Sequence, residues 1–339
     1  MAAMIPPLGP YYEDKLEDLR RIFGPNATLV ADGLLVGDRR YPIIDDVIIT
    51  LDAARLPGPL STSPLPGGSG PTSSAPYSED VQRTFSSEWK QYPEMLTEYR
   101  TEVTRYFDLL PLGELSEASV VDLGCGIGRW ATFVSDQCRS ITLVDFSEAI
   151  FVARKNMDQR VNAIFVMGDL LDLPFVDDAF DVGYCLGVLH HLPVNALTAM
   201  RDLRRLAGRF IVYIYYDLDN RPPHFRLLLK AVTQARKRFC KIESGTIRNI
   251  LTWSITLLVY KPLCVLGPLV ERFTRVGSIP LVEGYRHATL RRLRQDVYDR
   301  FFTPIEQRFT KAQIMELSDS FETVTVSDEV PYWHFLCAR

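Results

Sequence analysis

A glycine-rich turn joins an apolar segment to a helix-like segment in the middle of the chain. Residues 120–130 read VVDLGCGIGRW, with Gly124, Gly126 and Gly128 at every second position and Cys125 between the first two. Glycine lets the backbone approach a ligand without a Cβ in the way, and the N–H groups at the start of a helix bind polar ligand atoms. The segment therefore predicts a nucleotide-type binding loop.

An acid ahead of this loop narrows the choice of ligand. Dinucleotide-binding loops have GxGxxG at this place, whereas the spacing here is GxGxG, and Asp122 stands two residues before the first glycine. When the ligand has no pyrophosphate, a carboxylate near the loop can instead bind a positively charged amino group of the ligand, either directly or through a water molecule. The pattern favours S-adenosylmethionine (SAM) over NAD, and the alternative role for Asp122 is to cap a strand end.

Two more acids end the next apolar segments. Asp145 follows residues 141–144, 17 positions after Gly128, where a carboxylate can accept hydrogen bonds from both ribose hydroxyls in a doubly wound sheet. Asp169 comes soon after residues 163–167. It is predicted to accept a hydrogen bond from the adenine amino group, with Leu170 beside the ring.

Two adjacent histidines follow the fourth apolar segment, FDVGYCL at 180–186. His190 or His191 could act as a general base toward a hydroxyl nucleophile, because the unperturbed histidine pKa of ~6.5 lies near neutrality. Alternatively they orient the loop, since methyl transfer depends largely on alignment and needs a base only when the nucleophile starts protonated. Asp181, in the same segment, is predicted to cap a strand end.

The elements that must position these residues alternate between two types. Strands are predicted at 119–123, 140–144, 163–167, 181–185 and 209–216, and helices at 94–110, 149–159 and 196–206. This alternation indicates a parallel α/β sheet, which binds ligands at the carboxyl ends of its strands. A helix at 311–318 and strands at 322–327 and 332–338 complete the pattern.

Four motifs in this order resemble those of class I SAM-dependent methyltransferases of the small-molecule type: DLGCGIGRW, LVDFS, GDLLDLPF and FDVGYCLGVLHHL. The resemblance covers residues 85–216 and the terminal strands. It implies a Rossmann-like, seven-stranded, mostly parallel sheet with an antiparallel last strand, SAM as cofactor and S-adenosylhomocysteine as product. Residues 85–92 resemble an aromatic helix that covers the cofactor in some relatives. The predicted cofactor contacts are Tyr92, Asp122, Gly124, Cys125, Gly126, Gly128, Asp145, Phe146, Ser147, Gly168, Asp169, Leu170 and Leu186.

The chain before these motifs divides into a module and a linker. Residues 1–55 contain short β-type runs at 28–31, 34–36 and 47–51, and RYPIIDDV at 40–47 resembles the end of a zinc-ribbon-like module without its cysteines. The six cysteines of the chain are scattered and form no CxxC pair, so we expect neither a metal nor a disulfide framework. Residues 56–78 are rich in proline, glycine and serine and predict a flexible linker, followed by the methyltransferase domain at 79–339.

A long insertion, residues 217–309, interrupts this domain and is predicted to be a helical lid. Its apolar stretch at 249–270 is broken by Lys261, Pro262 and Pro268, whereas a membrane-spanning helix needs ~20 continuous apolar residues. We therefore expect a pair of helices that roof an apolar substrate pocket. An open alternative is peripheral contact of residues 225–270 with an anionic membrane, because basic residues precede the apolar run; a solvated basic face is the other.

The same insertion holds 17 Lys or Arg against 8 Asp or Glu. Tyr285, Arg286 and His287 are predicted to contact the substrate, and the arginines that follow them could bind its phosphate or carboxylate. Alternatively the arginines form an exposed helix face that pairs with Asp296 and Asp299. These arginines are Arg291, Arg292 and Arg294.

The working hypothesis is methyl transfer to O, C or N of a small, apolar or amphiphilic acceptor such as a natural product, quinone or lipid-like molecule. Two alternatives stay open, an enzyme that modifies RNA or protein and a non-catalytic SAM-binding regulatory subunit. Residues 186–189 read LGVL and not an Asn/Asp-Pro-Pro-Tyr/Phe motif, so nucleic acid is not the expected partner. The N-terminus has no secretory signal, which predicts a cytoplasmic protein, and the oligomeric state is left open.

Overall fold

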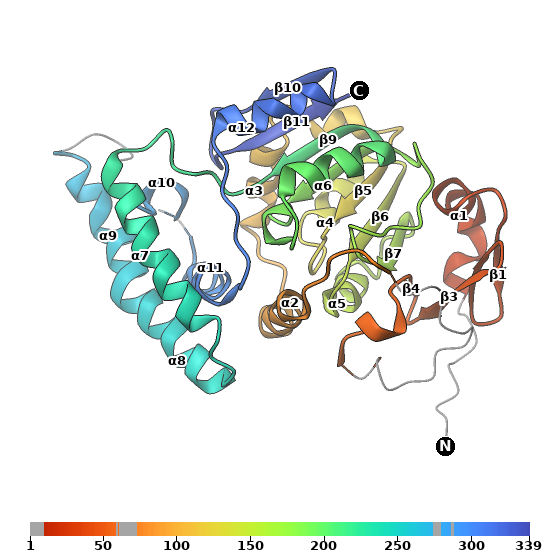
Figure 1. Ribbon diagram of the computed structural model, residues 1–339, viewed down its shortest axis with the longest axis horizontal. Helices are drawn as coiled ribbons and strands as arrows, with labels where there is room; N and C mark the ends of the chain where they lie inside the picture. The colour runs from red at the N-terminus through yellow and green to blue at the C-terminus, as the bar shows by residue number, and fades with distance from the viewer. Residues whose placement is uncertain (1–9, 59, 61–72, 274–278, 286–287) are drawn as a thin grey trace.

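A mixed sheet forms the centre of the computed structural model, which describes residues 10–58, 60, 73–273, 279–285 and 288–339 (Figure 1). Its core strands are β5 (Ser119–Leu123), β6 (Ser140–Asp145), β7 (Ala163–Met167), β8 (Phe180–Leu186), β9 (Ala207–Tyr213), β10 (Thr323–Val326) and β11 (His334–Ala338). They lie in the order β7-β6-β5-β8-β9-β11-β10. The first five are parallel, and β11 is antiparallel to both of its neighbours. The predicted α/β fold with its antiparallel last strand is confirmed.

Helices cover both faces of this sheet. One apolar core includes α1 (Leu16–Phe23), α6 (Ala196–Leu203) and α12 (Lys311–Met315), and the other includes α3 (Tyr99–Tyr106), α4 (Ala131–Val134) and α5 (Ala149–Asn156). Val121 of β5 packs into the first core and Val120 into the second, because successive strand side chains point to opposite faces. Every residue of β5, β6 and β7 is buried. Burial on both faces explains why these strands read as nearly continuous apolar runs.

The helix predicted at 94–110 is much shorter in the structure. Helix α3 begins only at Tyr99, without a side-chain cap, and ends at Tyr106. Met95, Leu96 and Leu110 still pack against the same core as α3. The apolar periodicity therefore marked a buried segment of which only the middle is helical. The preceding helix, α2 (Glu79–Gln91), is capped by the Ser78 hydroxyl, which accepts a hydrogen bond from the backbone N–H of Val81.

The N-terminal module is β-rich as predicted, but its strands continue the central sheet. It comprises β1 (Ala27–Val30), β2 (Gly33–Val36), β3 (Arg39–Ile44) and β4 (Val47–Ile49). Strand β4 pairs in parallel with β7, so in the described part of the chain the seven expected strands belong to a sheet of eleven. Tyr12 reinforces the junction, since its hydroxyl donates a hydrogen bond to the Asp46 carbonyl at 2.6 Å. Strand β3 was not predicted, because it contains Pro42 and begins with two arginines.

Two other expectations concern the same region. Most of the linker predicted at 56–78 lies outside the described residues, which resume at Ser73. No three His, Cys, Asp or Glu side chains come together as a metal site within the described part of the chain. The resemblance to a zinc-ribbon-like module without its cysteines stays a prediction.

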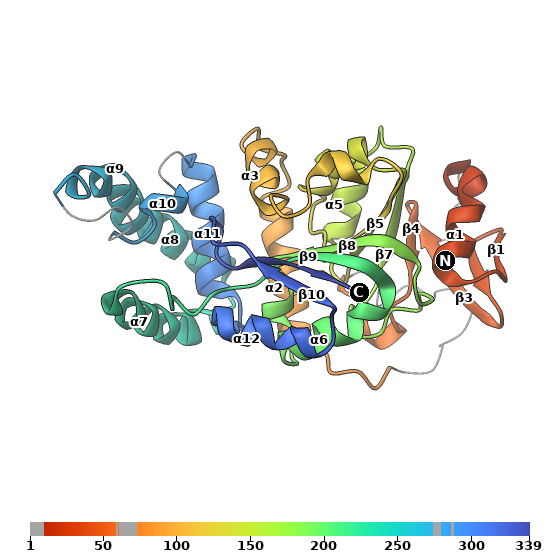
Figure 2. The same ribbon diagram turned by 90° about the horizontal axis from the view of Figure 1, so that it is seen from above.

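The insertion after β9 forms a helical lobe beside the sheet, as Figures 1 and 2 show. Its helices are α7 (Pro223–Phe239), α8 (Gly245–Ile255), α9 (Lys261–Val270), α10 (Val282–Tyr285) and α11 (Leu290–Phe302). A π-helical turn, Thr256–Tyr260, joins α8 to α9, so Gly245–Val270 is one helix of 26 residues. The interruption expected at Lys261, Pro262 and Pro268 is wrong, since Pro268 also lies inside α9. The wide turn precedes Pro262, whose ring and missing N–H a regular helix interior would not tolerate.

Candidate active site

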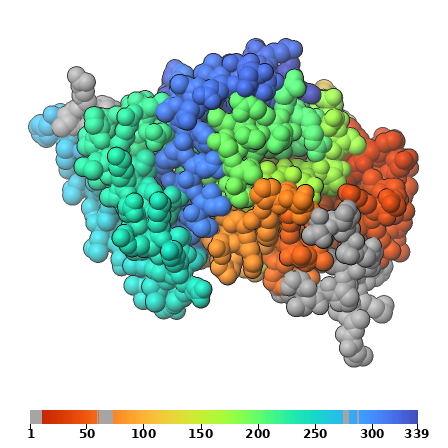
Figure 3. All heavy atoms as spheres, in the orientation of Figure 1, coloured from red at the N-terminus to blue at the C-terminus, as the bar shows by residue number. Residues whose placement is uncertain are grey.

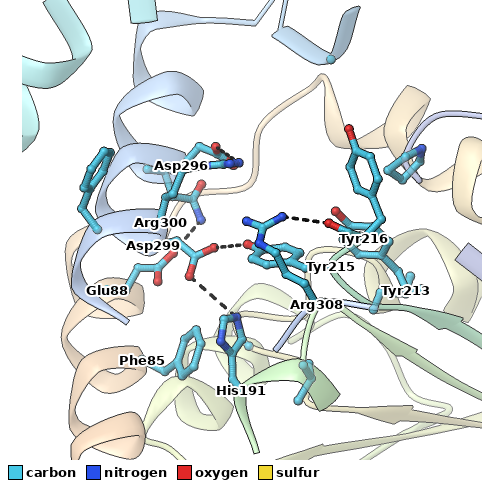
Figure 4. Close-up of a pocket in the computed structure, with 18 of the residues that line it drawn as sticks. Phe85, Glu88, His191, Tyr213, Tyr215, Tyr216, Asp296, Asp299, Arg300 and Arg308 are labelled. Atoms are coloured by element: carbon cyan, nitrogen blue, oxygen red, sulfur yellow. Dashed lines mark hydrogen bonds and ion pairs between the residues drawn. The ribbon is translucent and has the colours of Figure 1, made fainter. Parts of the chain in front are cut away.

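A cavity of about 780 Å³ lies between the carboxyl edge of the sheet and the helical lobe. This volume is within the ~300–1,000 Å³ typical of small-molecule sites. The loops that follow β5, β6, β7 and β8 line one end, and residues of α7, α9, α10 and α11 line the other. Figure 4 shows part of this cavity, with Glu88 of α2 on one side and His191 of the β8 loop on another.

The glycine-rich loop after β5 is in a backbone conformation that requires glycine. Gly124 and Gly126 have φ angles of 84° and 54°, in the left-handed region that other residues rarely adopt. A Cβ on Gly124 would lie 2.4 Å from a Val188 methyl group, and one on Gly126 would lie 3.1 Å from the Trp89 ring. The loop therefore presents bare backbone to the cavity, as a nucleotide site needs.

Asp145, at the end of β6, lines the cavity and also holds the glycine loop in place. Its Oδ2 accepts a hydrogen bond from the Gly126 N–H at 2.9 Å, and its Oδ1 accepts bonds from the Ser147 N–H and hydroxyl at 2.8 and 2.6 Å. Burial raises the pKa of this carboxyl, and these hydrogen bonds oppose the shift. Oδ2 has a further lone pair, so a ribose hydroxyl could still donate to Asp145.

Asp169, just after β7, lines the same end of the cavity and is paired with a residue that sequence analysis missed. Its Oδ2 accepts a hydrogen bond from Arg55 Nη1 at 2.9 Å, and both residues are buried. The other guanidinium nitrogen of Arg55 donates to the carbonyls of Ser73 and Ala75. No motif surrounds Arg55 in the sequence, so only the fold reveals that the N-terminal segment reaches the cavity.

Most of the predicted cofactor residues line the cavity, and five do not. Those that line it are Gly124, Cys125, Gly126, Asp145, Phe146, Asp169, Leu170 and Leu186. Three of the others support the loops from behind. Gly128 is packed tightly against Ala153 and Met157, Ser147 is buried against Asp145, and a Cβ on Gly168 would lie 2.6 Å from the Thr50 hydroxyl.

Asp122 is the fourth exception, because its carboxyl lies within the sheet and not on the cavity wall. It is 1% exposed, and its Oδ2 accepts a hydrogen bond from the Tyr184 hydroxyl of β8 at 2.9 Å. Burial raises the pKa of Asp122 to about 8 despite this bond. The structure thus places it as a buried partner of Tyr184. Asp181 has the capping role that was predicted for it, since it accepts hydrogen bonds from the Ser119 N–H and hydroxyl, both at 2.7 Å.

Tyr92 is the fifth exception, although the helix it was assigned to does cover the cavity. Tyr92 follows the last residue of α2 and packs with Tyr298 in the helical lobe. Phe85 and Trp89 of α2 line the cavity instead. Their spacing of four residues, which places two side chains on one helix face, was the signal available in the sequence.

The two histidines have different surroundings. His191 lines the cavity, and its Nδ1 lies 2.7 Å from the Ile305 carbonyl oxygen. Because a carbonyl only accepts, Nδ1 carries the proton and the Nε2 lone pair of the neutral ring is left available. His190 is fully buried and stacks on the Tyr215 ring at 3.8 Å, and burial lowers its pKa well below the usual value. Only His191 is positioned to contact a substrate.

A carboxylate faces the available nitrogen of His191 (Figure 4). Asp299 Oδ1 of α11 lies 4.0 Å from Nε2, and its Oδ2 accepts a hydrogen bond from the Tyr215 hydroxyl at 2.8 Å. The 4.0 Å gap is too long for a hydrogen bond but close enough for the carboxylate to stabilise a protonated imidazole ring. Glu88, nearby, is buried, and this burial raises its pKa well above the usual value, with a further contribution from the negative charge of Asp299.

The predicted substrate residues can be located only in part. Tyr285 lines the cavity, whereas Arg286 and His287 lie outside the described residues. Arg292 also lines it and pairs with Glu102 at 3.5 Å and with Asp296 at 3.8 Å, so the alternative of pairing along α11 holds for this arginine. Arg291 pairs with Glu94, and Arg294 donates a hydrogen bond to Asn249 at 2.7 Å. Neither of these two lines the cavity.

Comparison with known proteins agrees with this geometry. Residues 120–208, which span β5 to the start of β9, match the model of a family described as a methyltransferase domain. The chain contains a class I SAM-dependent methyltransferase domain. The match includes the glycine loop, Asp145, Asp169 and both histidines of this methyltransferase domain. It ends before the helical lobe, which forms the other end of the cavity.

The methyltransferase domain is similar to several curated and solved proteins. Sterol 4-C-methyltransferase strm-1 of Caenorhabditis elegans is 34% identical over 128 residues, which cover 34% of this chain and 38% of that protein. Demethylmenaquinone methyltransferase of Staphylococcus aureus is 27% identical over 135 residues, 38% of this chain and 56% of that protein. Among solved structures, Haemonchus contortus phosphoethanolamine N-methyltransferase 1 gives a TM-score of 0.34 at 19% identity, covering 39% of this chain and 32% of that one. The matched regions thus span less than two thirds of each of these proteins.

Proposed function

We propose that the protein transfers a methyl group from SAM to a small amphiphilic acceptor that binds between His191 and the helical lobe. One observation carries this proposal: a single cavity contains both the glycine loop with its acids and the apolar inner sides of the lobe helices. A bound acceptor would therefore lie next to a bound cofactor without an intervening wall. Holding two reactants together in this way supplies a large part of catalysis.

The residues at the sheet end fit SAM by their chemistry. The bare backbone at Gly124 and Gly126 would accommodate the cofactor, and the carboxylates of Asp145 and Asp169 offer acceptors for hydroxyl and amino groups. Arg129 also lines this end, with its guanidinium carbon 5.2 Å from the Trp89 ring centroid, and would bind the carboxylate of the methionine tail. SAM, when bound, supplies a methyl group on a positively charged sulfur.

His191 would remove the proton from a hydroxyl or amino nucleophile of the acceptor. The Ile305 carbonyl holds the proton of the neutral ring on Nδ1, so Nε2 receives the acceptor's proton. Asp299, 4.0 Å away, would stabilise the imidazolium that forms. The Tyr215 hydroxyl orients Asp299, and burial together with the negative charge of Asp299 holds the pKa of Tyr215 well above its usual value. Tyr215 therefore stays protonated as a hydrogen-bond donor.

The acceptor class is inferred from the far end of the cavity. An apolar wall is formed there by Phe225, Leu229 and Val232 of α7 and Leu263 of α9. The polar groups on this part of the lining include those of Arg292 and Tyr285. Such a wall favours a molecule with a large apolar part and one polar end. The names of two relatives, a sterol methyltransferase and a demethylmenaquinone methyltransferase, support this class.

The first test is calorimetric titration of the full chain with SAM, S-adenosylhomocysteine and NAD. We expect micromolar binding of the two adenosyl ligands and none of NAD. Binding of NAD alone would refute the proposal. Release of S-adenosylhomocysteine is then measured with quinol, sterol and phenol acceptors. Turnover with any of them excludes a purely regulatory SAM-binding role, and turnover confined to RNA or protein would replace the proposed acceptor class.

A further inference from the structure

The outer side of the helical lobe is unusually apolar for a surface. Of the 16 large apolar side chains that are exposed among the described residues, 12 lie between Leu227 and Phe273. Leu258, Leu227 and Phe273 are 76%, 70% and 90% exposed. We call the outward sides of α7, α8, the π turn and α9 the lobe face. Large apolar side chains exposed in such numbers on one lobe mark a contact with a partner or a membrane.

The long helix of the lobe has one partnered side and one open side. Its buried residues Thr252, Thr256, Tyr260 and Cys264 recur every four positions, so they share one side of the helix. That side packs against α11 along α8 and the π turn. The rest of the helix surface is exposed as a broad apolar stripe that includes Leu257, Leu258 and Val259.

Charges on α11 argue against a membrane-spanning arrangement of the same helix. By length and composition Gly245–Val270 could cross a bilayer. However, α11 packs along it and carries Arg292, Asp296 and Arg300, an ion-pair network that a spanning orientation would bring into lipid. Charged groups at the bilayer centre are costly. The open stripe therefore fits a helix that lies in the interfacial layer and does not cross it.

Basic side chains border the lobe face. Arg226, Lys230, Lys237, Lys241 and Lys261 are all exposed. Lys261 lies four residues after Leu257 and four before Val265, on the same side of the helix, where a long lysine side chain can reach from apolar surroundings to lipid headgroups. The described part of 223–273 contains two acids, of which Glu243 is exposed and Glu271 is partly buried. This excess of positive charge complements an anionic lipid surface.

The helices of the lobe face also form the cavity wall. Leu228 of α7 and Val259 of the π turn line the cavity, and each is nearly half exposed. Figure 3 shows the residues of the helical lobe along one flank of the molecule, at the opposite end from the N-terminal module. An amphiphile that leaves a membrane at this flank would pass between apolar side chains toward His191.

We propose that the lobe face binds the interfacial layer of an anionic membrane and that the acceptor enters the cavity from that membrane. The second half of this statement rests on the proposed methyl transfer, whereas the first half does not. The occupant is a lipid surface, because the apolar stripe and the flanking lysines occur together. A second copy of the chain would cover the stripe but leave two sets of like charges close to each other.

The test is binding of the full chain to vesicles, measured by co-sedimentation at physiological salt. We expect binding to vesicles of phosphatidylcholine with 30–40% phosphatidylglycerol, and binding at least about tenfold weaker to phosphatidylcholine alone. The double variant Leu258→Glu/Leu266→Glu should lose at least about tenfold in the partition coefficient. Val161→Glu is the matched control, since Val161 is also 76% exposed but lies outside the lobe face. It should bind like the unmodified protein.

Four results would overturn the inference. The unmodified protein could fail to bind anionic vesicles, or the control could lose as much binding as the double variant. Light scattering could instead show a dimer that the double variant dissociates, which would make the lobe face a contact between copies. Salt-dependent binding of RNA without binding of vesicles would assign the basic border to nucleic acid.

Failure of this inference is distinguishable from failure of the proposed function. SAM titration and turnover of a detergent-dispersed acceptor do not require the membrane, so both should be unchanged in the double variant. Turnover of the same acceptor embedded in vesicles should fall at least about tenfold. Equal turnover from vesicles would refute delivery through the lobe face. Vesicle binding without any SAM binding would refute the methyltransferase proposal alone.

Discussion

Replacement of Asp122 by asparagine separates two roles for this residue. The sequence predicts that its carboxylate serves the cofactor, whereas the structure places it in the sheet as the acceptor of the Tyr184 hydroxyl at 2.9 Å. Asparagine has nearly the same shape and keeps one carbonyl oxygen for Tyr184. Asp122→Asn should therefore preserve the fold and the affinity for SAM, while removing a titrating group from the core.

The expected effect on stability follows from the pKa of the buried carboxyl. Burial raises the pKa of Asp122 from 3.8 to about 8, so between these values the folded protein binds a proton that the unfolded chain releases. The free energy of unfolding then falls as the pH rises, by about 1.4 kcal/mol per pH unit. Between pH 5 and pH 8 the free energy of unfolding of the unmodified protein should therefore fall by up to about 4 kcal/mol, whereas that of the variant should not show this fall.

The assay is urea unfolding of both proteins at pH 5, 6, 7 and 8. Asp181→Asn is the control, because it lies at the start of the same strand as Tyr184 and has the opposite shift. Slight burial alone would raise the pKa of Asp181, but hydrogen bonds from Ser119 hold it below its usual value. The contribution of Asp181 to the free energy of unfolding is therefore present at neutral pH and is lost only as the pH falls through this lowered pKa. Parallel curves for the unmodified protein and Asp122→Asn would refute the reasoning. A tenfold loss of SAM affinity in Asp122→Asn would restore the cofactor role.

Three further predictions test other parts of the site. His191→Gln should lower kcat for a hydroxyl acceptor by roughly 10²–10⁴ with SAM affinity unchanged, whereas His190→Phe should stay active; equal loss in both would refute the assignment of the base. Arg55→Ala should lower the free energy of unfolding by about 3–5 kcal/mol, because it leaves the buried Asp169 carboxylate unpaired; an unchanged thermal midpoint would show that the pair is not formed. Gly124→Ala should cost about 1–3 kcal/mol in backbone strain besides its clash with Val188, measured by unfolding and SAM titration, and adding Val188→Ala should rescue only the clash; full rescue would mean that the φ of 84° is not required.

The cofactor end of the site was predictable because its information is local. A buried parallel strand followed by a tight turn leaves its mark within a few residues, so the sequence located β5 and β7 at their observed bounds and found Asp145 and Asp169. Even so, local patterns do not tell which side of a strand faces the ligand. Asp122 and Gly128 lie within the motif, yet they face the sheet and α5, and only the register with β8 shows this for Asp122.

The acceptor end was not predictable in the same way, since distant segments build it. His191 depends on Ile305 for its tautomer and on Asp299 for its charge partner, more than 100 positions away along the chain. Likewise, the residues around position 261 do not indicate that a π turn lets the helix continue through Lys261 and Pro262. Composition predicted the helices and their apolar character. It did not predict that the inner sides of these helices would line the cavity while their outer sides form the exposed lobe face.

The N-terminal segment shows why a domain boundary drawn from composition is not a functional boundary. Arg55 belongs to the predicted module, yet its guanidinium holds Asp169 and its carbonyl accepts hydrogen bonds from Tyr77 and from Gln82 of α2. Gln82 in turn donates to the carbonyl of Phe146, which lines the cavity. One arginine thus connects the module, the segment after residue 72, α2 and the cofactor end of the cavity. Because a ligand beside Asp169 would contact several of these segments at once, its binding energy would stabilise the attachment of the N-terminal module to the sheet.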